Sequence, residues 1–199
     1  MTALRLFLAV EVKDPAILEK IENIQSELGA TKTRMKLVRP ENLHFTLKFL
    51  GTTPETLVKE ISAIMQRIDV KKFPVTIKEL GCFPRLSRPR VIWLGLSQGF
   101  EHLAKIAKFL DEELYTIGFE REKRLFSAHL TLARIKESRI DPQLTQQLKE
   151  LQNIEIGTFI VAEVVLKKST LTPKGPIYET LKTKSLSQRE ILNKSEKNT

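Results

Sequence analysis

The sequence of 199 residues contains one cysteine, 7% aromatic residues and eight scattered glycines, and it has no long hydrophobic run. A single cysteine, Cys82, cannot form an internal disulfide, which fits a reducing compartment, so we expect a cytoplasmic protein. No apolar stretch approaches the roughly 20 residues that span a bilayer, so we expect no membrane partner. The scattered glycines form no phosphate-binding loop. These absences argue against a disulfide scaffold, a membrane-spanning helix and a glycine-loop nucleotide enzyme.

The chain is strongly basic. Lys and Arg number 33 against 24 Asp and Glu, which gives a formal net charge of +9. A basic surface suits a polyanionic partner, and nucleic acid is the commonest one. Lysine-rich chains that bind no polyanion are also common, so the charge favours nucleic acid without deciding the matter.

Two of the three histidines lie in the same four-residue pattern, His-apolar-Thr-Leu, at residues 44–47 and 129–132. In a β-strand alternate side chains share a face, so His44 and Thr46 project together and the second copy behaves likewise. A lone histidine in an apolar strand is usually structural, but two unrelated structural histidines would rarely share this pattern. The repeat therefore predicts a site built from two half-sites, each an imidazole beside a hydroxyl.

The chain alternates between expected strands and helices, and the motif recurs after 129 − 44 = 85 residues. We expect strands at 4–10, 36–39, 43–51, 73–81, 91–96, 128–132, 156–167 and 178–182, and helices at 15–28, 52–68, 100–117 and 141–151. This order suggests an α+β fold of two pseudo-duplicated lobes, each an antiparallel sheet with helices on its outer side, with the active-site cleft between the sheets. We expect residues 1–185 to form one bilobal domain and the polar residues 186–199 to form a flexible tail.

Two imidazoles can divide acid and base roles near neutral pH, because their ordinary pKa is about 6.5. Displacement at phosphorus needs both roles, and the hydroxyls of Thr46 and Thr131 can donate to the non-bridging oxygens, where charge builds. The sequence offers no acidic cluster for magnesium and no credible zinc set, so we expect neither a metal nor a cofactor. A 2′,3′-cyclic phosphate at an RNA end suits this chemistry, since it is an activated diester that requires the 2′-hydroxyl.

Two segments resemble the paired signatures of the two-histidine phosphoesterases: residues 40–51, which read PENLHFTLKFLG, and residues 129–134, which read HLTLAR. Residues 5–10 resemble the family's first strand, so the likeness covers about the first 185 residues. The most similar branch is the bacterial and archaeal RNA 2′,3′-cyclic phosphodiesterase, historically called 2′-5′ RNA ligase. The resemblance implies hydrolysis to a 2′-phosphomonoester, with His44 as proton donor to the leaving 3′-oxygen and His129 as proton acceptor from water. The symmetry of the motifs leaves these two roles unassigned by the residues themselves.

Three positions near the motifs need separate comment. The family usually has proline before the second histidine, where this chain has Ala128, which leaves the entry to that strand less rigid. Arg134 matches a position that the family uses for substrate binding, but strict alternation puts it on the face of Leu130, so it reaches the cleft only if the strand bulges. Lys48 shares the face of His44 by the same count, and we expect it to contact phosphate or to be solvated.

Two alternatives to hydrolysis stay open. A 2′-5′ RNA ligase would join tRNA halves with 2′,3′-cyclic phosphate and 5′-hydroxyl ends in the same site, and no residue distinguishes it. A non-catalytic RNA-binding module is a different class of protein, but binding alone does not need two complete His-x-Thr pairs. We expect a monomer whose substrate is RNA with a cyclic phosphate end, tRNA halves being one candidate.

Overall fold

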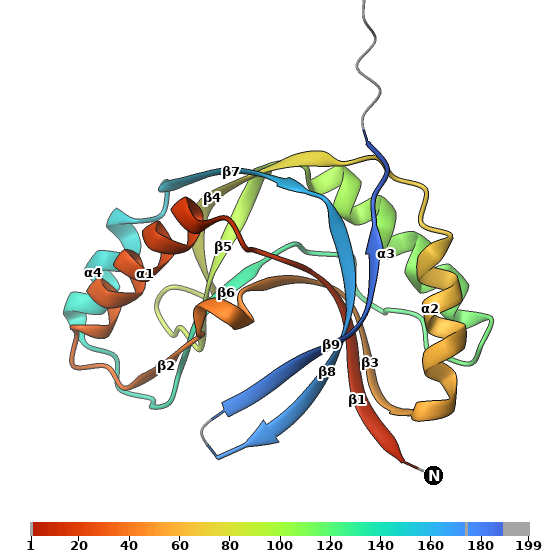
Figure 1. Cartoon of the computed structure of the whole chain (residues 1–199). Helices are drawn as coiled ribbons and strands as arrows, with labels where there is room; N and C mark the ends of the chain where they lie inside the picture. Colours follow the sequence, from red (N-terminus) through yellow and green to blue (C-terminus); the bar gives the residue numbers. More distant parts are fainter. Residues whose placement is uncertain (1, 174, 189–199) are drawn as a thin grey trace, which may run out of the picture.

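The computed structural model describes residues 2–173 and 175–188, and within them the chain alternates between strands and helices (Figure 1). The helices are α1 (Pro15–Gly29), α2 (Val58–Gln66), α3 (Phe100–Tyr115) and α4 (Pro142–Glu150), with short 3-10 turns η1 (Pro40–Asn42) and η2 (Glu55–Leu57). The strands are β1 (Ala3–Glu11), β2 (Met35–Leu37), β3 (His44–Pro54), β4 (Phe73–Phe83), β5 (Val91–Gln98), β6 (Leu130–Ile135), β7 (Glu155–Val161), β8 (Glu163–Thr172) and β9 (Gly175–Ser185).

Local sequence explains the starts of two helices. Asp14 accepts hydrogen bonds from two first-turn N–H groups of α1, and Asp141 accepts one from the Gln143 N–H of α4. A proline follows each aspartate, where its missing N–H costs nothing and its fixed φ suits the first turn. Both helices therefore begin where the Asp-Pro pairs predict.

The strands form one antiparallel sheet in the order β7-β4-β5-β6-β3-β1-β8-β9, with β2 on the edge of β6. The sheet curls, and its two halves join at the centre through a single residue pair, Phe45 of β3 opposite Leu130 of β6. The two motif strands are therefore neighbours, one from each half. The expected α+β fold with two lobes is confirmed, with the refinement that the two sheets meet edge to edge.

Each half carries its helices on the outer side (Figure 1). Helix α1 packs on β7, β6 and β2, whereas α3 packs on β3 and α2 packs on α3 and β9. A largely aliphatic core lies between helices and sheet, and it buries Phe45, Leu130 and Leu132 completely. The apolar residues of the motifs thus anchor the strands, which leaves the opposite face of each strand for the cleft.

Two expectations about the C-terminal part are corrected. The strand expected at 156–167 is two strands, β7 and β8, which break at Ala162 and belong to different halves of the sheet. The expected tail does not begin at residue 186, because Leu186 is only 3% exposed and its N–H donates to the Ala162 carbonyl at 2.8 Å. Residues 189–199 of that expected tail lie outside the described part of the chain. In the described part, no helix has the length and apolar character needed to cross a membrane.

Candidate active site

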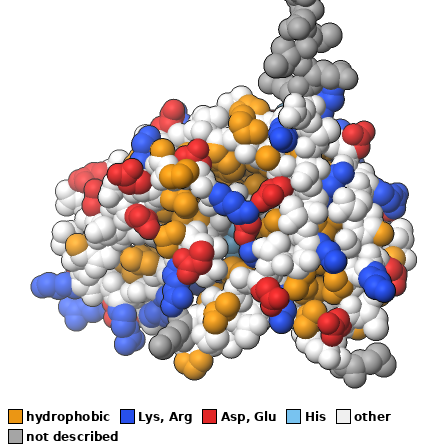
Figure 2. All heavy atoms as spheres, in the orientation of Figure 1, with side chains coloured by type: hydrophobic (Ala, Val, Ile, Leu, Met, Phe, Trp, Pro, Cys, Tyr) orange, Lys and Arg blue, Asp and Glu red, His pale blue; other side chains and the backbone are white. Residues whose placement is uncertain are grey.

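A cavity of about 470 Å³ lies between the two halves of the sheet and contains both motif pairs. In the space-filling view a histidine is visible between the two halves, with both Lys or Arg and Asp or Glu side chains around it on this face (Figure 2). The cavity lining includes four permanent cations and, among the described residues, no carboxylate; the cations are Arg5, Lys36, Arg39 and Arg134. This charge pattern favours an anionic ligand.

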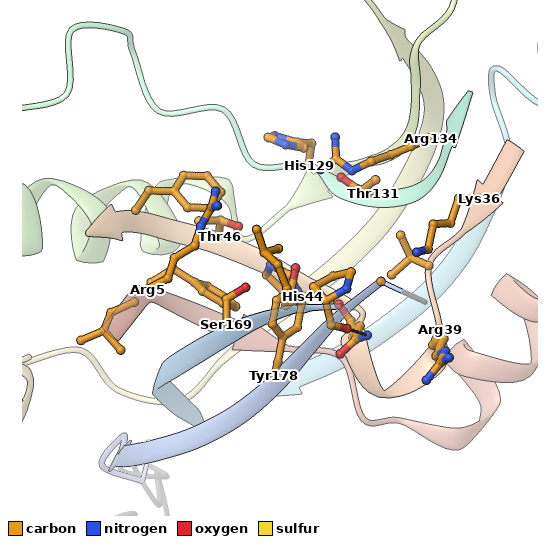
Figure 3. Close-up of a pocket in the computed structure, with 18 of the residues that line it drawn as sticks. Arg5, Lys36, Arg39, His44, Thr46, His129, Thr131, Arg134, Ser169 and Tyr178 are labelled. Carbon is orange, nitrogen blue, oxygen red and sulfur yellow. Dashed lines mark hydrogen bonds between the residues drawn. The ribbon is translucent and has the colours of Figure 1, made fainter. Parts of the chain in front are cut away.

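His44 and His129 are held in the two halves by the same kind of hydrogen bond, from ring Nδ1 to a backbone carbonyl. His44 Nδ1 lies 2.6 Å from the Asn42 carbonyl oxygen, and His129 Nδ1 lies 2.9 Å from the Ser127 carbonyl oxygen, each two residues before its histidine. A carbonyl can only accept, so Nδ1 carries the proton in both rings. Each Nε2 is therefore left free for chemistry, and the two side chains face the cavity from opposite sides (Figure 3).

The threonines that the motifs predicted also line the cavity. Thr46 and Thr131 each lie on the same side of the strand as their histidine. Figure 3 shows Thr131 beside His129 and Thr46 on the strand that carries His44. The structure thus brings together both imidazole–hydroxyl pairs that the repeat predicts.

Aromatic rings surround His44. The ring of Phe7 lies 4.9 Å from the imidazole, and the ring of Tyr178 meets it edge-on at 5.4 Å between centroids. Burial lowers the pKa of His44, and the charges of Lys167 and His129 act in the same direction, whereas the Asn42 carbonyl and Glu11 oppose them. The free protein therefore favours the neutral form of His44, and a bound anion would act in the opposite direction.

The second histidine also has an aromatic neighbour. The ring of Phe83 meets the imidazole of His129 edge-on at 5.3 Å, and it lies 5.1 Å from the ring of Trp93. Phe83 is the last residue of β4, two residues beyond the strand that we expected at 73–81. No local pattern indicated this contact, because it depends on the pairing of β4 with β5 and of β5 with β6.

Arg134 reaches the cavity because β6 bulges. Leu132 has no partner of its own on β5, since the residues on either side of it pair with consecutive residues of that strand. One extra residue shifts the alternation by one position, so Arg134 projects on the side of Thr131 rather than into the core. Both residues line the cavity (Figure 3). The condition set by the sequence, a bulge in this strand, is therefore met.

Lys48 is not in the cavity, and both options considered for it from the sequence are wrong. Strand β3 bulges at Leu47, which turns Lys48 toward the core, where it is only 3% exposed. Its ammonium donates to Asp111 Oδ1 at 2.5 Å and to the Glu120 carbonyl at 2.6 Å. Phe49, which is 63% exposed, takes the place in the cavity that strict alternation assigned to Lys48.

Several cavity residues were not predicted as site residues. Arg5 lies on β1, Lys36 and Arg39 lie shortly before the first motif, and Tyr178 is on the hairpin formed by β8 and β9. Their side-chain types fit an RNA ligand, but only the folded sheet places them near the histidines. Among the described residues, no group of three or more His, Cys, Asp or Glu side chains is arranged to hold a metal ion.

Comparison with known proteins finds that the family model for LigT-like phosphoesterases matches this chain twice, over residues 10–93 and 94–178. Each match contains one His-x-Thr pair. The chain belongs to the LigT-like phosphoesterase family. The double match also supports the duplication suggested by the 85-residue repeat.

Similar members of the family include proteins named RNA 2′,3′-cyclic phosphodiesterase. The one from Aeropyrum pernix is 38% identical over 81% of this chain and 92% of its own length. The one from Methanothermobacter thermautotrophicus is 39% identical over 87% of this chain and 94% of its own length. Among solved structures, TT0787 of Thermus thermophilus has a TM-score of 0.79 at 26% identity, covering 93% of this chain and 99% of its own. Escherichia coli LigT complexed with 3′-AMP has a TM-score of 0.73 at 28% identity, covering 94% of this chain and 100% of its own.

Proposed function

We propose that this LigT-like phosphoesterase is a metal-independent RNA 2′,3′-cyclic phosphodiesterase that opens a cyclic phosphate RNA end to a 2′-phosphomonoester. One observation carries the proposal. Two imidazoles, each with Nδ1 hydrogen-bonded to a backbone carbonyl, share a cavity with two threonine hydroxyls, and none of the described residues that line it is a carboxylate. Relatives at 38–39% identity over most of the chain bear the name of this activity, which supports the same assignment.

In this reaction water attacks phosphorus and the bond from phosphorus to the 3′-oxygen breaks. His129 accepts the proton of the water, and His44 donates a proton to the leaving 3′-oxygen. Thr46 and Thr131 donate hydrogen bonds to the non-bridging oxygens, whose charge increases in the transition state. Arg134 adds a positive charge on the side of Thr131, and the family resemblance of this position supports its role in substrate binding. Solvent then restores the two histidines to their starting protonation states.

The surroundings of His44 fit an acid that is charged only when substrate is present. Burial lowers the pKa of His44 in the free protein, so few molecules carry the imidazolium at neutral pH. A phosphodiester anion beside the ring favours the charged form and raises the pKa. Substrate binding and protonation of the acid are therefore coupled.

The aromatic rings near the histidines suit the nucleobase of the terminal nucleotide. Phe49 is largely exposed in the cavity, and Tyr178 lines it from the opposite hairpin. Stacking of a base on an aromatic side chain contributes about 1–3 kcal/mol and tolerates any base. We therefore expect the enzyme to accept all four terminal nucleotides.

The first test is incubation of purified protein, with EDTA present, with a 2′,3′-cyclic nucleotide, followed by separation of 2′- from 3′-phosphate products. We expect only the 2′-phosphate. His44→Ala and His129→Ala should each lower the rate by about 10²–10⁴, because each removes one partner in proton transfer. His102→Ala is the matched control, since His102 stacks on Phe73 at 4.6 Å and does not line the cavity.

Two results would contradict the proposal: activity that disappears with EDTA and returns with a metal, or substantial activity in both alanine variants. Ligation remains the alternative within the same site, and tRNA halves remain the candidate substrate for it. Incubation of tRNA halves that bear cyclic phosphate and 5′-hydroxyl ends distinguishes the two reactions by the size of the product. Binding without turnover would instead favour the RNA-binding module.

A further inference from the structure

A second groove adjoins the cavity on one side. It lies between residues 49–54 and Leu57 on one wall and the loop 117–124 on the other, and we call it the side groove. Phe49 and Gly51 line both the cavity and the side groove, so the two hollows are adjacent. The loop runs on directly to His129, so one wall of the side groove is covalently linked to the catalytic pair.

We propose that the side groove binds the single RNA strand upstream of the terminal nucleotide, an inference that rests on the proposed function. The cavity, at about 470 Å³, has the size of a site for one small ligand. The rest of an RNA substrate must therefore leave it along the surface. The exposed ring of Phe49 stands at the junction, where a base can stack, and cations follow beyond it.

The charges of the loop suit a phosphate backbone. Arg121, Lys123 and Arg124 line the side groove together with Glu120 and Glu122. All five side chains are exposed. In the described part of the chain, Lys123 and Arg124 make neither an ion pair nor a hydrogen bond, so both are available to a ligand.

The negative charge of Glu122 is partly compensated by a nearby cation, and Arg121 is engaged by an aromatic ring. The carboxylate of Glu122 lies 3.9 Å from the ammonium of Lys48, which reduces its repulsion of a phosphate. The guanidinium of Arg121 lies over the ring of Tyr115 at 4.7 Å, directed toward α3. Lys123 and Arg124 are therefore the better candidates for phosphate contacts.

The loop is fixed in place by polar contacts with Lys48 and Asp111. The ammonium of Lys48 donates to the Glu120 carbonyl, and the Glu122 N–H donates to Asp111 Oδ1 at 2.9 Å. Because Asp111 also accepts from Lys48, one carboxylate joins β3, α3 and the loop. The wall of the side groove is thus preformed, which lowers the entropic cost of binding a strand.

The end of the cavity away from the side groove offers less room for the RNA strand to leave. Figure 3 places Arg5 at one end and Lys36 with Arg39 at the other. Arg5 on β1 lies opposite Thr52 on β3 in the strand register, and Thr52 lines the side groove. The side groove is therefore at the Arg5 end of the cavity. At the other end the β8–β9 hairpin approaches closely. Asn42 Nδ2 donates to the Pro176 carbonyl at 3.3 Å, and a Cβ on Gly175 would come within 2.4 Å of Lys36 Nζ.

The test compares a 2′,3′-cyclic mononucleotide with a short RNA oligonucleotide that ends in a 2′,3′-cyclic phosphate. In the double variant Lys123→Gln/Arg124→Gln we expect kcat/KM for the oligonucleotide to fall about fivefold or more at low salt, with little change for the mononucleotide. The slope of log(kcat/KM) against log salt for the oligonucleotide should shrink by about 1.4, since each contact with a single strand contributes ~0.7. Lys59→Gln/Lys105→Gln is the control, because it removes the same charge from exposed positions on α2 and α3 that line neither hollow.

Equal losses on both substrates, or equal losses in both double variants, would overturn the side groove as an RNA site. Failure of the wild-type protein to turn over either substrate would instead contradict the proposed function. In that case the side groove is tested by fluorescence anisotropy with an RNA oligonucleotide that ends in a 2′-phosphate. Weaker binding by Lys123→Gln/Arg124→Gln than by the control variant is expected, and equal binding would overturn the inference.

Discussion

At the scale of single residues, the sequence predicted the two His-x-Thr pairs because strand alternation is local and the repeat is visible in the sequence. The structure places His44, Thr46, His129 and Thr131 around one cavity. The environment of each imidazole was not predictable in the same way. Tyr178 reaches His44 from a strand more than 130 positions away in the sequence, so no local pattern could indicate the contact.

The pKa of His44 provides a direct test at this scale. We expect the imidazole of His44 to titrate below pH 6.5 in the free protein, because burial disfavours the charged ring. Saturation with a 2′-nucleotide should raise this pKa, since the phosphate anion favours the imidazolium. The measurement is an NMR titration of the imidazole signals, which number three and are assigned with His→Ala variants. The signals of His102 should not respond to the nucleotide, and an unchanged pKa of His44 on nucleotide binding would contradict the coupling.

At the scale of elements, the two motif strands bulge at the same point. The extra residue follows the threonine in both, Leu47 in β3 and Leu132 in β6. The bulges turn Phe49 and Arg134 into the cavity, so one half supplies an aromatic ring and the other a cation. Strict alternation predicted neither placement, because a bulge depends on how a strand pairs with its neighbours, β1 and β5 here.

The bulge in β3 also makes Lys48 a structural residue, and this can be tested. Lys48→Met should lower the free energy of unfolding by about 1–3 kcal/mol, because it leaves Asp111 and the Glu120 carbonyl without their buried donor. Turnover of a cyclic mononucleotide should stay within about twofold of the wild type, since a residue outside the cavity contributes no proton transfer. Urea unfolding and initial rates measure the two effects, with Lys59→Met as the exposed control. A large loss of mononucleotide turnover at unchanged stability would place Lys48 in the chemistry instead.

At the scale of the whole molecule, the helices tie the two halves together. Helix α1 follows β1 but packs on β7 and β6, whereas α3 follows β5 but packs on β3. Each of these two helices therefore covers the half of the sheet that does not contain the strand preceding it. Lys20 of α1 donates to the Ile156 carbonyl, and Gln25 donates to the Leu132 carbonyl, which fixes this crossing. Helical periodicity predicted the helices, but it carries no information on which half of the sheet each helix covers.

Because the halves are joined in this way, we expect them to unfold together and to lose stability together in acid. The groups whose pKa values are lowered in the folded protein include His44, Glu11 and Asp111. Burial lowers that of His44; for Glu11 and Asp111 burial acts to raise the pKa, but hydrogen bonds and nearby positive charges outweigh it. The partners are Lys13 and Lys167 for Glu11, and Lys48 with the Glu122 N–H for Asp111.

A group with a lowered pKa in the folded state contributes stability that is present above its unfolded pKa and is lost as pH falls through its folded pKa. The free energy of unfolding should therefore begin to fall as pH drops below about 6.5, where His44 protonates in the unfolded chain. It should fall further below about pH 4.5, where the two carboxylates do the same. Urea unfolding at pH 3–8, followed by both circular dichroism and Trp93 fluorescence, measures this, and the two signals should change together. His44→Asn should remove the part of the loss that begins near pH 6.5 and leave the part below pH 4.5. Stability that increases on acidification would contradict the predicted loss of stability in acid, and two separate transitions would contradict the joint unfolding of the two halves.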